Sequence, residues 1–464
     1  MVLFSHTVEA QDAHYWFKQH GPTSNFLGGA VTGGVRDNSA IFYNPGATAF
    51  TTDFTLSIQS DAISYSNLFI RNGAGQDINM QQGILESAPQ MFAVSYGVKK
   101  RPNWRTSFGF LTTNYSNFKL RARNEELVDI YPANGSDEIY VGSWNYRNRT
   151  REDWFGGAIT HKIGDNLGIG LSTFFTFRSY EYVESKDQNI FIADINGNFQ
   201  PKRYIYYSDN IDGSAAGLLF KLGVAWEIKD FKFGLSVTTP RAQLNFLGNF
   251  FLNSSRYSEL SGPDSNLIIP NYTLQYEKAK STYKSPWIFD VGVMKNFFDT
   301  DLYFRVAYYS KIDVYQMIEP TDPTKISQLI SGTIPGSGRV LMANKEIWNF
   351  GFGWNRQFTE KFGMMAGFRT DFNNLDHEVL NEANAVVPAI SYWNIYHLSG
   401  GTTVTILKHK FTVGITYSHG TDKNGPQFFN LEPPKADEVF KLPDATAQAY
   451  YDQINLLIGY VYNF

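Results

Sequence analysis

The last twelve residues of the chain, QINLLIGYVYNF (453–464), alternate between large apolar side chains and a mixed set that includes Asn455, Gly459 and Asn463. The first set comprises Ile454, Leu456, Ile458, Tyr460, Tyr462 and Phe464. A period of two predicts a β-strand with one apolar face, because a helix would need a spacing near 3.6. Soluble domains rarely end on such an aromatic face, so the fold depends on what this face contacts.

The same alternation recurs from about residue 53, in stretches joined in turn by very short and by long connections. The short ones are KKRPNW (99–104), GDN (164–166), KD (229–230), FFDTD (297–301), TEK (359–361) and LKHK (407–410). The long, polar ones centre near residues 72–88, 124–136, 187–200, 250–270, 319–337, 373–387 and 424–446. These thirteen connections predict fourteen strands. An even number of antiparallel strands, with short turns at one end and long loops at the other, is typical of outer-membrane barrels.

Two predicted strands show how the two faces of the predicted sheet differ in composition. In LGIGLSTFFTF (167–177) and LLFKLGVAWEI (218–228), one face is almost unbroken apolar, and the other carries Gly, Ser, Thr or charged residues. A soluble sandwich would also alternate, but lipid is the simplest solvent for so continuous an apolar face. We therefore expect an all-β fold, a 14-stranded antiparallel transmembrane barrel, in which the C-terminal strand closes the wall.

Composition supports this class and argues against several others. Hydrophobic residues make up 43% of the chain, mean hydropathy is -0.29, and no apolar run approaches the ~20 residues of a membrane helix. The net charge of -4 argues against a nucleic-acid partner. The chain has no cysteine, and its eight histidines form no cluster at metal-binding spacing. It also lacks a G-x-S-x-G elbow, a P-loop and a dinucleotide fingerprint, so we expect no enzyme, no metal and no cofactor.

The residues before the first strand divide into two parts. Residues 1–10 end in Val8-Glu9-Ala10, which fits a small-x-small cleavage site, so we interpret them as a signal-peptide remnant. Residues 11–52 are rich in Gly and do not alternate. About forty residues are too few for an independent domain. They could fold inside the lumen, because fourteen strands enclose more space than their own side chains fill. The barrel itself is expected over residues 53–464.

The stretch GGAVTGGVRDNSAIFYNPG (28–46) resembles the N-terminal hatch of the FadL/TodX family of outer-membrane transporters for hydrophobic compounds. The family's lead-in matches Asp37 and Ser39, and its Asn-Pro-Ala motif matches Asn44, Pro45 and Gly46, with Gly in place of Ala. Specific sequence motifs match the family only over residues ~25–50. Over the rest of the chain the resemblance lies in the architecture, including the number of strands. The stretch HYWFKQHGPTSNFLGGAV (14–31) is most similar to the Bacteroidota branch of the family.

This resemblance implies a barrel plugged by the hatch and passive uptake of hydrophobic small molecules, namely long-chain fatty acids or aromatic hydrocarbons. Ligand would be caught at the extracellular side, pass to an inner site and leave sideways beside a kinked third strand, with Gly109 or Asn114 at the kink. The expected partners are outer-membrane lipid, the hydrophobic ligand and a protein bound through the extracellular loops. Two alternatives remain open: a protein-interaction barrel that serves type IX secretion as a carrier or translocon partner, and a general porin for polar solutes.

Two groups of residues are candidates for ligand binding. The first is aromatic or apolar, lies in the N-terminal segment and could cradle an acyl chain or a hydrocarbon: Tyr15, Trp16, Phe17, Phe26 and Leu27. The second consists of arginines that alternation places on the inner face: Arg178, Arg305 and Arg369. An inward arginine could bind a ligand carboxylate through two parallel hydrogen bonds. The structural alternatives are that the aromatic residues form the core of the hatch and that the arginines belong to ion pairs in a polar lumen.

Overall fold

The fold is described from a computed structural model. It describes residues 13–34, 37–51, 54–193, 196–244, 250–260, 272–319, 326–328, 339–376, 385–386, 391–427 and 429–463. The predicted signal-peptide remnant (1–10) lies outside these residues. Within them, no helix is both long and apolar enough to cross a bilayer.

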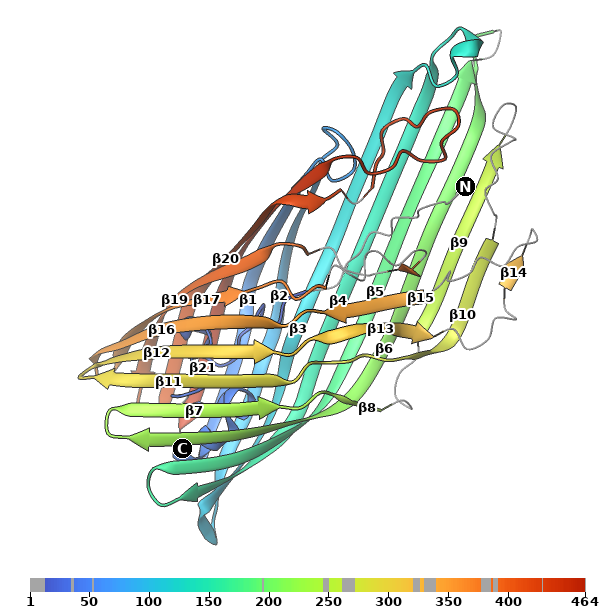
Figure 1. The fold of residues 1–464 in the computed structure, drawn as a ribbon. Coiled ribbons are helices and arrows are strands. Elements are labelled where there is room, and N and C mark those ends of the chain that lie inside the picture. Colours follow the sequence, from blue (N-terminus) through green and yellow to red (C-terminus); the bar gives the residue numbers. More distant parts are fainter. Residues whose placement is uncertain are drawn as a thin grey trace.

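Fourteen of the described strands close into one barrel, and each is antiparallel to both neighbours (Figure 1). They are β1 (Phe54–Arg71), β2 (Met80–Val98), β3 (Arg101–Val128), β4 (Glu138–Ile163), β5 (Leu167–Ala193), β6 (Phe199–Ile228), β7 (Phe231–Thr238), β11 (Ile288–Phe297), β12 (Thr300–Tyr309), β16 (Ile347–Thr359), β17 (Phe362–Asp371), β19 (Asn394–Ile406), β20 (His409–Pro426) and β21 (Thr446–Asn463). The pairing of β21 with β1, from Thr55↔Asn463 to Arg71↔Gln448, closes the wall. This confirms the predicted strand number, and all six short connections are hairpin turns.

At the end opposite the tight turns, the wall continues far beyond what a membrane requires (Figure 1). Strands β3 to β6 contain 28, 26, 27 and 30 residues, whereas a tilted transmembrane strand needs about 9–11. Further short strands continue this sheet: β8 (Ala242–Gln243), β9 (Phe250–Leu260), β10 (Tyr272–Ser281), β13 (Ile312–Glu319), β14 (Ile326–Gln328), β15 (Arg339–Asn344) and β18 (Ala385–Val386). The expected long loops near 72–88, 124–136, 187–200 and 250–270 are therefore partly wrong, because each contains strand.

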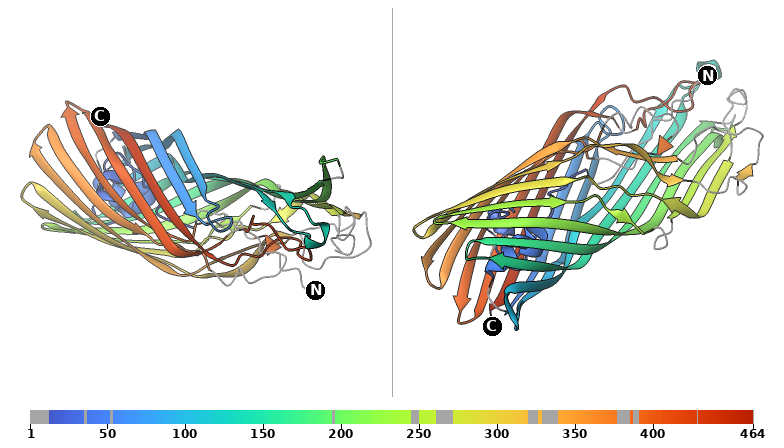
Figure 2. Two further views of the ribbon diagram at one scale, coloured as in Figure 1. Left: turned by 90° about the horizontal axis from the view of Figure 1, so that it is seen from above. Right: turned by 60° about the horizontal axis from the view of Figure 1, so that its bottom comes forward.

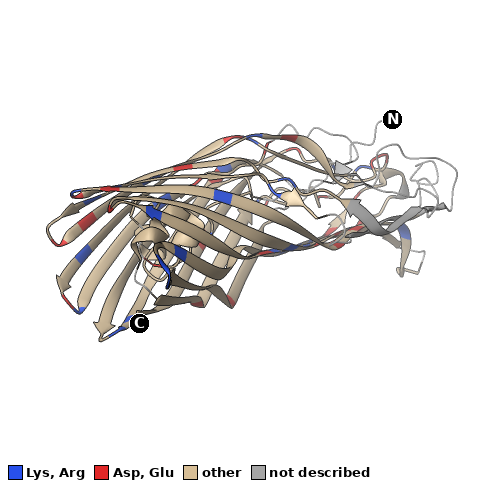
Figure 3. Cartoon of the chain, turned by 90° about the horizontal axis from the view of Figure 1, so that it is seen from below, with Lys and Arg blue, Asp and Glu red and all other residues tan. Residues whose placement is uncertain are grey.

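The two faces of the wall differ as alternation predicts. Ile169, Leu171 and Phe177 of β5 are 38–45% exposed and point outward, whereas Ser172 and Thr176 between them are fully buried. In β21, Ile454 and Ile458 are about half exposed. Figure 3 shows charged residues at the tight turns that end the barrel strands. The outer surface therefore carries an apolar belt that ends at polar turns, as the C-terminal sequence predicted.

The N-terminal segment, defined here as residues 13–34 and 37–51, lies against the inner face of the barrel (Figure 2). It contains three short helices: η1 (Asn25–Leu27), α1 (Ala40–Tyr43) and η2 (Pro45–Phe50). Helix η2 contacts β3 to β7, and η1 contacts β16, β17, β19 and β20. The segment thus touches opposite parts of the wall, and its side chains fill space in the lumen near the tight turns.

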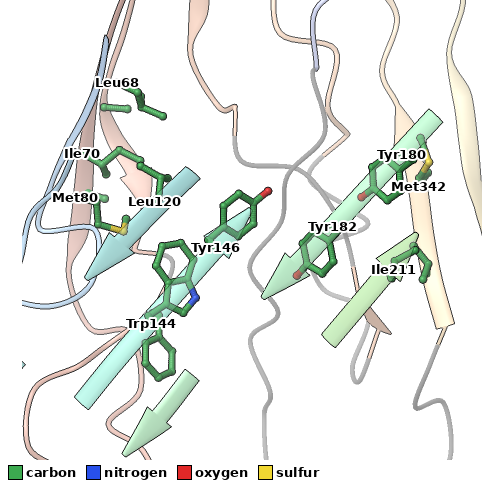
Figure 4. Packing of buried hydrophobic residues seen from close by; sticks show 14 of the residues in the cluster. Leu68, Ile70, Met80, Leu120, Trp144, Tyr146, Tyr180, Tyr182, Ile211 and Met342 are labelled. Atoms are coloured by element: carbon green, nitrogen blue, oxygen red, sulfur yellow. The ribbon is translucent and has the colours of Figure 1, made fainter. Parts of the chain in front are cut away.

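The other end of the lumen holds an aromatic cluster that includes Trp144, Tyr146 and Tyr182 (Figure 4). The connection between β20 and β21 packs onto it through Phe429 and Leu431. Arg203 of β6 holds this connection, because its Nη1 and Nη2 donate to the carbonyls of residues 438 and 436 at 2.6 and 2.9 Å. A further short helix, η3 (Pro132–Asn134), follows β3.

Candidate functional site

A cavity of about 120 Å³ lies between the N-terminal segment and the barrel wall. His14, Tyr15, Lys18 and Phe42 line it from the segment. The barrel side is formed by residues of β3 to β6, β11, β12 and β15 and of the stretches after β7, β10 and β17. Residues separated by more than a hundred positions in the sequence therefore meet here. This position inside the wall makes the cavity the candidate binding site.

Two arginines share one carboxylate in this cavity. Arg178 Nη1 donates to Glu152 Oε2 at 3.0 Å, and Arg241 Nη2 donates to Glu152 Oε1 at 2.5 Å. The Cζ atoms of the two arginines lie 4.1 and 4.6 Å from the ring centre of Tyr283. Trp154 Nε1 also donates to Glu152, at 2.7 Å. The cluster therefore holds two positive charges and one negative charge.

Several buried N–H groups of this cluster have no hydrogen-bond partner among the described residues: Arg178 Nη2, Arg241 Nε and Arg241 Nη1. Both arginine side chains are at least 95% buried. Unsatisfied buried donors are rare and costly, and arginine is suited to planar, two-pronged recognition of carboxylates. The cavity can therefore accept a ligand group that carries hydrogen-bond acceptors, above all an anionic one.

The rest of the cavity wall is largely apolar or aromatic. Tyr15 stacks on Tyr309 with ring centres 4.3 Å apart and planes 8° apart. Leu219 and Trp154 face the same space. An apolar lining with a small number of polar groups is the usual form of a small-molecule site. The cavity thus combines a charged end with apolar walls.

The predicted aromatic candidates are divided among different environments. Tyr15 lines the cavity, and Phe17 lines a smaller cavity of about 30 Å³. Trp16 is 1% exposed and donates from Nε1 to Tyr309 Oη at 2.7 Å. Phe26 and Leu27 are also 1% exposed and pack in a separate cluster near the tight turns. The described cavities therefore include two of these five residues, and the other three are packed as core.

The predicted arginines divide in the same way. Arg178 lines the cavity, whereas Arg305 and Arg369 hold the N-terminal segment. Arg305 Nε donates to Asp290 at 2.6 Å, and its Nη1 donates to the carbonyl of Gly29 at 3.1 Å. Arg369 donates to the carbonyls of residues 16 and 17 at 3.0 and 3.1 Å. Both arginines connect the barrel wall to the segment.

The residues of the Asp-x-Ser…Asn-Pro-Gly motif fix the path of the segment. Asp37 Oδ1 accepts from the Ser39 backbone N–H at 2.9 Å, before α1 begins. Asn44 Nδ2 donates to the carbonyls of residues 32 and 224, both at 2.9 Å, so it connects segment and wall. Pro45 is the first residue of η2, a position that needs no N–H donor. A Cβ on Gly46 would lie 2.6 Å from the carbonyl oxygen of Gly168, which explains why this chain has Gly where the family motif has Ala.

Inward glycines of the barrel provide the surface on which the segment rests. A Cβ on Gly367 would lie 2.2 Å from the backbone N of Gly28, and one on Gly223 would lie 2.3 Å from Asn44 Oδ1. The same close approach occurs at other wall glycines: Gly168, Gly170, Gly234, Gly292, Gly353, Gly401, Gly414 and Gly459. Glycine lets a backbone approach closely. The Gly-rich inner face is thus shaped to the segment.

The wall contains a seam between β2 and β3. Their ladder runs from Val98↔Arg101 to Met91↔Leu111, and no ladder pair joins the described stretches 80–90 and 112–128 beyond it. Side chains bridge the seam instead: Asn117 Nδ2 donates to Glu86 at 2.7 Å. A register shift in β3 between residues 112 and 114 marks the same point, near the expected kink at Asn114.

The smaller cavity connects the N-terminal segment with this seam. His14 and Lys18 line both cavities, and Glu86 and Asn117 of the seam line the smaller one. Lys18 Nζ also forms a 2.7 Å ion pair with Asp61, which accepts a hydrogen bond from Gln90 of β2. The binding cavity, the segment and the seam are therefore neighbours.

No family model and no curated protein sequence matches this chain. Solved structures do. The Pseudomonas putida toluene transporter TodX superimposes with a TM-score of 0.58 at 13% identity, over 96% of this chain and 98% of that chain. The CymD monoaromatic hydrocarbon channel gives 0.56 at 10% identity, over 96% and 97%. A Pseudomonas aeruginosa FadL homologue gives 0.54 at 12% identity, over 97% and 100%. The chain therefore shares the fold of these channels over 96–97% of its length.

Proposed function

We propose that this chain is an outer-membrane channel for the passive uptake of hydrophobic small molecules. The observation that carries the proposal is the seam between β2 and β3 in a barrel whose lumen contains the N-terminal segment. A hydrophobic solute can leave sideways into lipid through such a seam, whereas a hydrated solute would need a continuous aqueous path. The names of the similar structures, a toluene transporter and a monoaromatic hydrocarbon channel, support the same substrate class.

The apolar belt and the closed barrel support placement in a bacterial outer membrane. On this basis residues 11–52 act as the hatch and residues 53–464 form the membrane barrel. The extensive contacts between hatch and wall argue for a channel that conducts few ions, unlike a general porin. Membership of the Bacteroidota branch rests on the resemblance of residues 14–31.

The cavity favours an amphiphile with a polar or anionic end over a plain hydrocarbon. Its unpartnered guanidinium N–H groups at Arg178 and Arg241 would bind a carboxylate, and Tyr15 and Trp154 would contact the chain or ring. A neutral aromatic compound would leave these donors unsatisfied, which costs binding free energy. The charged end of the cavity therefore suits the carboxylate of a fatty acid better than it suits toluene, and a cavity of about 120 Å³ would hold only the part of the chain next to that carboxylate.

The alternative, a protein-interaction barrel in type IX secretion, has less support. The long loop near 424–446 could dock a partner, but its part between β20 and β21 packs against its own chain: Phe429 and Leu431 join the aromatic cluster, and Arg203 of β6 donates to its carbonyls. Lys441 of this connection is paired with Glu432, and this hydrogen bond raises the pKa of the ammonium group. These contacts occupy surface that a partner would need.

Uptake by whole cells tests the proposal, because an outer membrane slows the entry of hydrophobic compounds. The chain is expressed in a host that lacks its own channel of this kind, and initial uptake of radiolabelled oleate and of toluene is measured. We expect faster oleate uptake than in the empty-vector host and little ion conductance in planar bilayers. Unchanged oleate uptake, or large conductance with no uptake, would reject the proposal.

A paired substitution tests the substrate class. Arg178→Gln with Arg241→Gln removes both cations from the cavity, and we expect at least tenfold lower oleate uptake with toluene uptake little changed. Arg123→Gln is the matched control, because Arg123 is exposed and pairs only with Glu125 among the described ion pairs. If both compounds lose uptake equally while the protein level holds, the cluster maintains the fold and does not select the ligand.

A further inference from the structure

A group of basic side chains lies on the outer face of β3 and β4, just beyond the apolar belt. On β4 the outward residues Phe155, Ile159 and Ile163 are 46–63% exposed and apolar. Towards the loop end, the same face of β4 carries Asp153 and then three arginines. We call the following five residues the basic patch: Lys119, Arg121, Arg147, Arg149 and Arg151.

Strand pairing brings these residues together. Lys119 lies opposite Arg147 in the ladder between β3 and β4, and Arg149 lies opposite Asn117. Like charges placed directly opposite each other are destabilising in a sheet. A pair such as Lys119 and Arg147 is therefore unfavourable unless an anion compensates it.

Carboxylates of the protein compensate only part of this charge. Arg147 pairs with Glu181 at 3.1 Å, and Arg151 pairs with Asp153 at 2.8 Å. None of the described ion pairs involves Lys119, Arg121 or Arg149, and all three side chains are exposed. Arg149 lies 6.0 Å over the ring of Tyr115. Lys119 and Arg121 thus remain open to an external anion, and Arg149, which lies opposite Glu181 in the ladder between β4 and β5, shares that carboxylate with Arg147.

Neighbouring elements limit the patch to β3 and β4. On β5 and β6, Glu181 lies opposite Asp212, so the outer face becomes acidic there. On the other side, the seam carries Glu86, which already accepts hydrogen bonds from Tyr115 and Asn117. The local excess of positive charge contrasts with the net charge of -4 of the whole chain.

We propose that the basic patch binds the phosphate groups of an anionic lipid in the outer leaflet. The proposal goes beyond the proposed function but rests on its membrane placement. Arg149 lies fourteen residues from Ile163, the outward residue at the tight-turn end of β4. At about 3.3 Å per residue and a strand tilt of about 45°, these fourteen residues span about 33 Å along the membrane normal, which places Arg149 just outside an apolar band about 25 Å tall, where headgroups begin. Arginine binds phosphate in a two-pronged manner, and lysine adds a point charge.

Native mass spectrometry on the full chain in mild detergent tests this, with diphosphoryl lipid A as the probe. The patch variant carries Lys119→Gln, Arg121→Gln and Arg149→Gln. The control carries Lys99→Gln, Lys100→Gln and Arg101→Gln, the same charge change at an exposed tight turn. Circular dichroism and heat-modifiable gel mobility confirm that both variants are folded.

We expect roughly 100-fold weaker lipid A binding in the patch variant, from about fivefold for each of the three cations lost, and little change in the control. Lipid A from which both phosphates have been removed should bind weakly to every variant. Equal binding by patch variant and wild type, equal loss in both variants, or undiminished binding of the dephosphorylated lipid would each overturn the proposal. The binding measurement does not involve oleate uptake. The lipid-binding proposal and the proposed transport function can therefore be refuted separately.

Discussion

Two adjacent glycines in β19 offer a matched test of how the N-terminal segment is held. A Cβ on Gly401 would lie 2.7 Å from Cγ of Phe26, whereas the nearest atom to a Cβ on Gly400 is 3.9 Å away. The Phe26 ring cannot move aside easily, because Gly414 confines it on another side, where a Cβ would lie 2.6 Å from Cε1. Gly401→Val therefore inserts three carbon atoms into occupied space, and Gly400→Val inserts them into open space.

Overpacking of this kind costs about 1–3 kcal/mol. Because a β-branched side chain adds atoms beyond the clashing Cβ, we expect about 2–3 kcal/mol against the docked segment for Gly401→Val. This changes the ratio of docked to undocked molecules by on the order of 30- to 150-fold. For Gly400→Val we expect a change of less than about 0.5 kcal/mol, the usual range for a surface substitution.

Thiol labelling measures the ratio directly, because the chain has no cysteine of its own. Ser24→Cys places one reporter at a position that is 2% exposed within the segment. With fast opening and closing, the labelling rate by a water-soluble maleimide follows the undocked population. We expect at least 30-fold faster labelling with Gly401→Val than with Gly400→Val. Equal rates in the two variants would refute the claim that wall glycines hold the segment.

Three further outcomes follow from the same contacts. Gly46→Ala introduces the residue of the family motif, yet it should speed labelling of the reporter, because the new Cβ meets backbone of β5 and β6; slower labelling would contradict the observed packing. Arg369→Gln removes two charge-assisted hydrogen bonds to the segment, each worth about 1.5–3 kcal/mol, and should raise the labelling rate at least tenfold, with Arg123→Gln as the exposed control. Ile159→Arg places a charge on the apolar belt and should cost about 2–4 kcal/mol of unfolding free energy in lipid vesicles, measured by urea titration; a loss under 0.5 kcal/mol would mean that lipid does not contact this face.

Strand number and turn positions were predictable because they depend on local patterns. Each tight turn interrupts an alternation whose apolar face is set by lipid, so KD (229–230) and TEK (359–361) stand out in the sequence. The extension of strands β3 to β6 beyond the length that a membrane requires was not predictable in the same way. A strand whose outer face meets water carries polar residues there, as Ser185, Asp187 and Asn189 of β5 do, and such a stretch resembles a loop.

The binding cavity was only partly predictable. Alternation places Arg178 on the inner face, and the structure puts it there. Its partners Glu152, Arg241 and Tyr283 come from strands and connections whose relative height depends on the stagger of the whole barrel. Alternation gives the face of a residue but not its height along the wall. The sequence signals available were the Glu-x-Trp pair at 152–154 and the arginine after Pro240, and neither is distinctive alone.

The seam between β2 and β3 is the route on which the account depends, and locking it is the most direct test. Glu86→Cys and Asn117→Cys place thiols on the two edges, where a short bis-methanethiosulfonate linker can join them. The control pair, Asn145→Cys and Ser185→Cys, joins β4 to β5, which are already paired. We expect that cross-linking the seam abolishes most oleate uptake, that reduction restores it, and that the control cross-link has little effect. Full uptake with the seam locked would contradict lateral release.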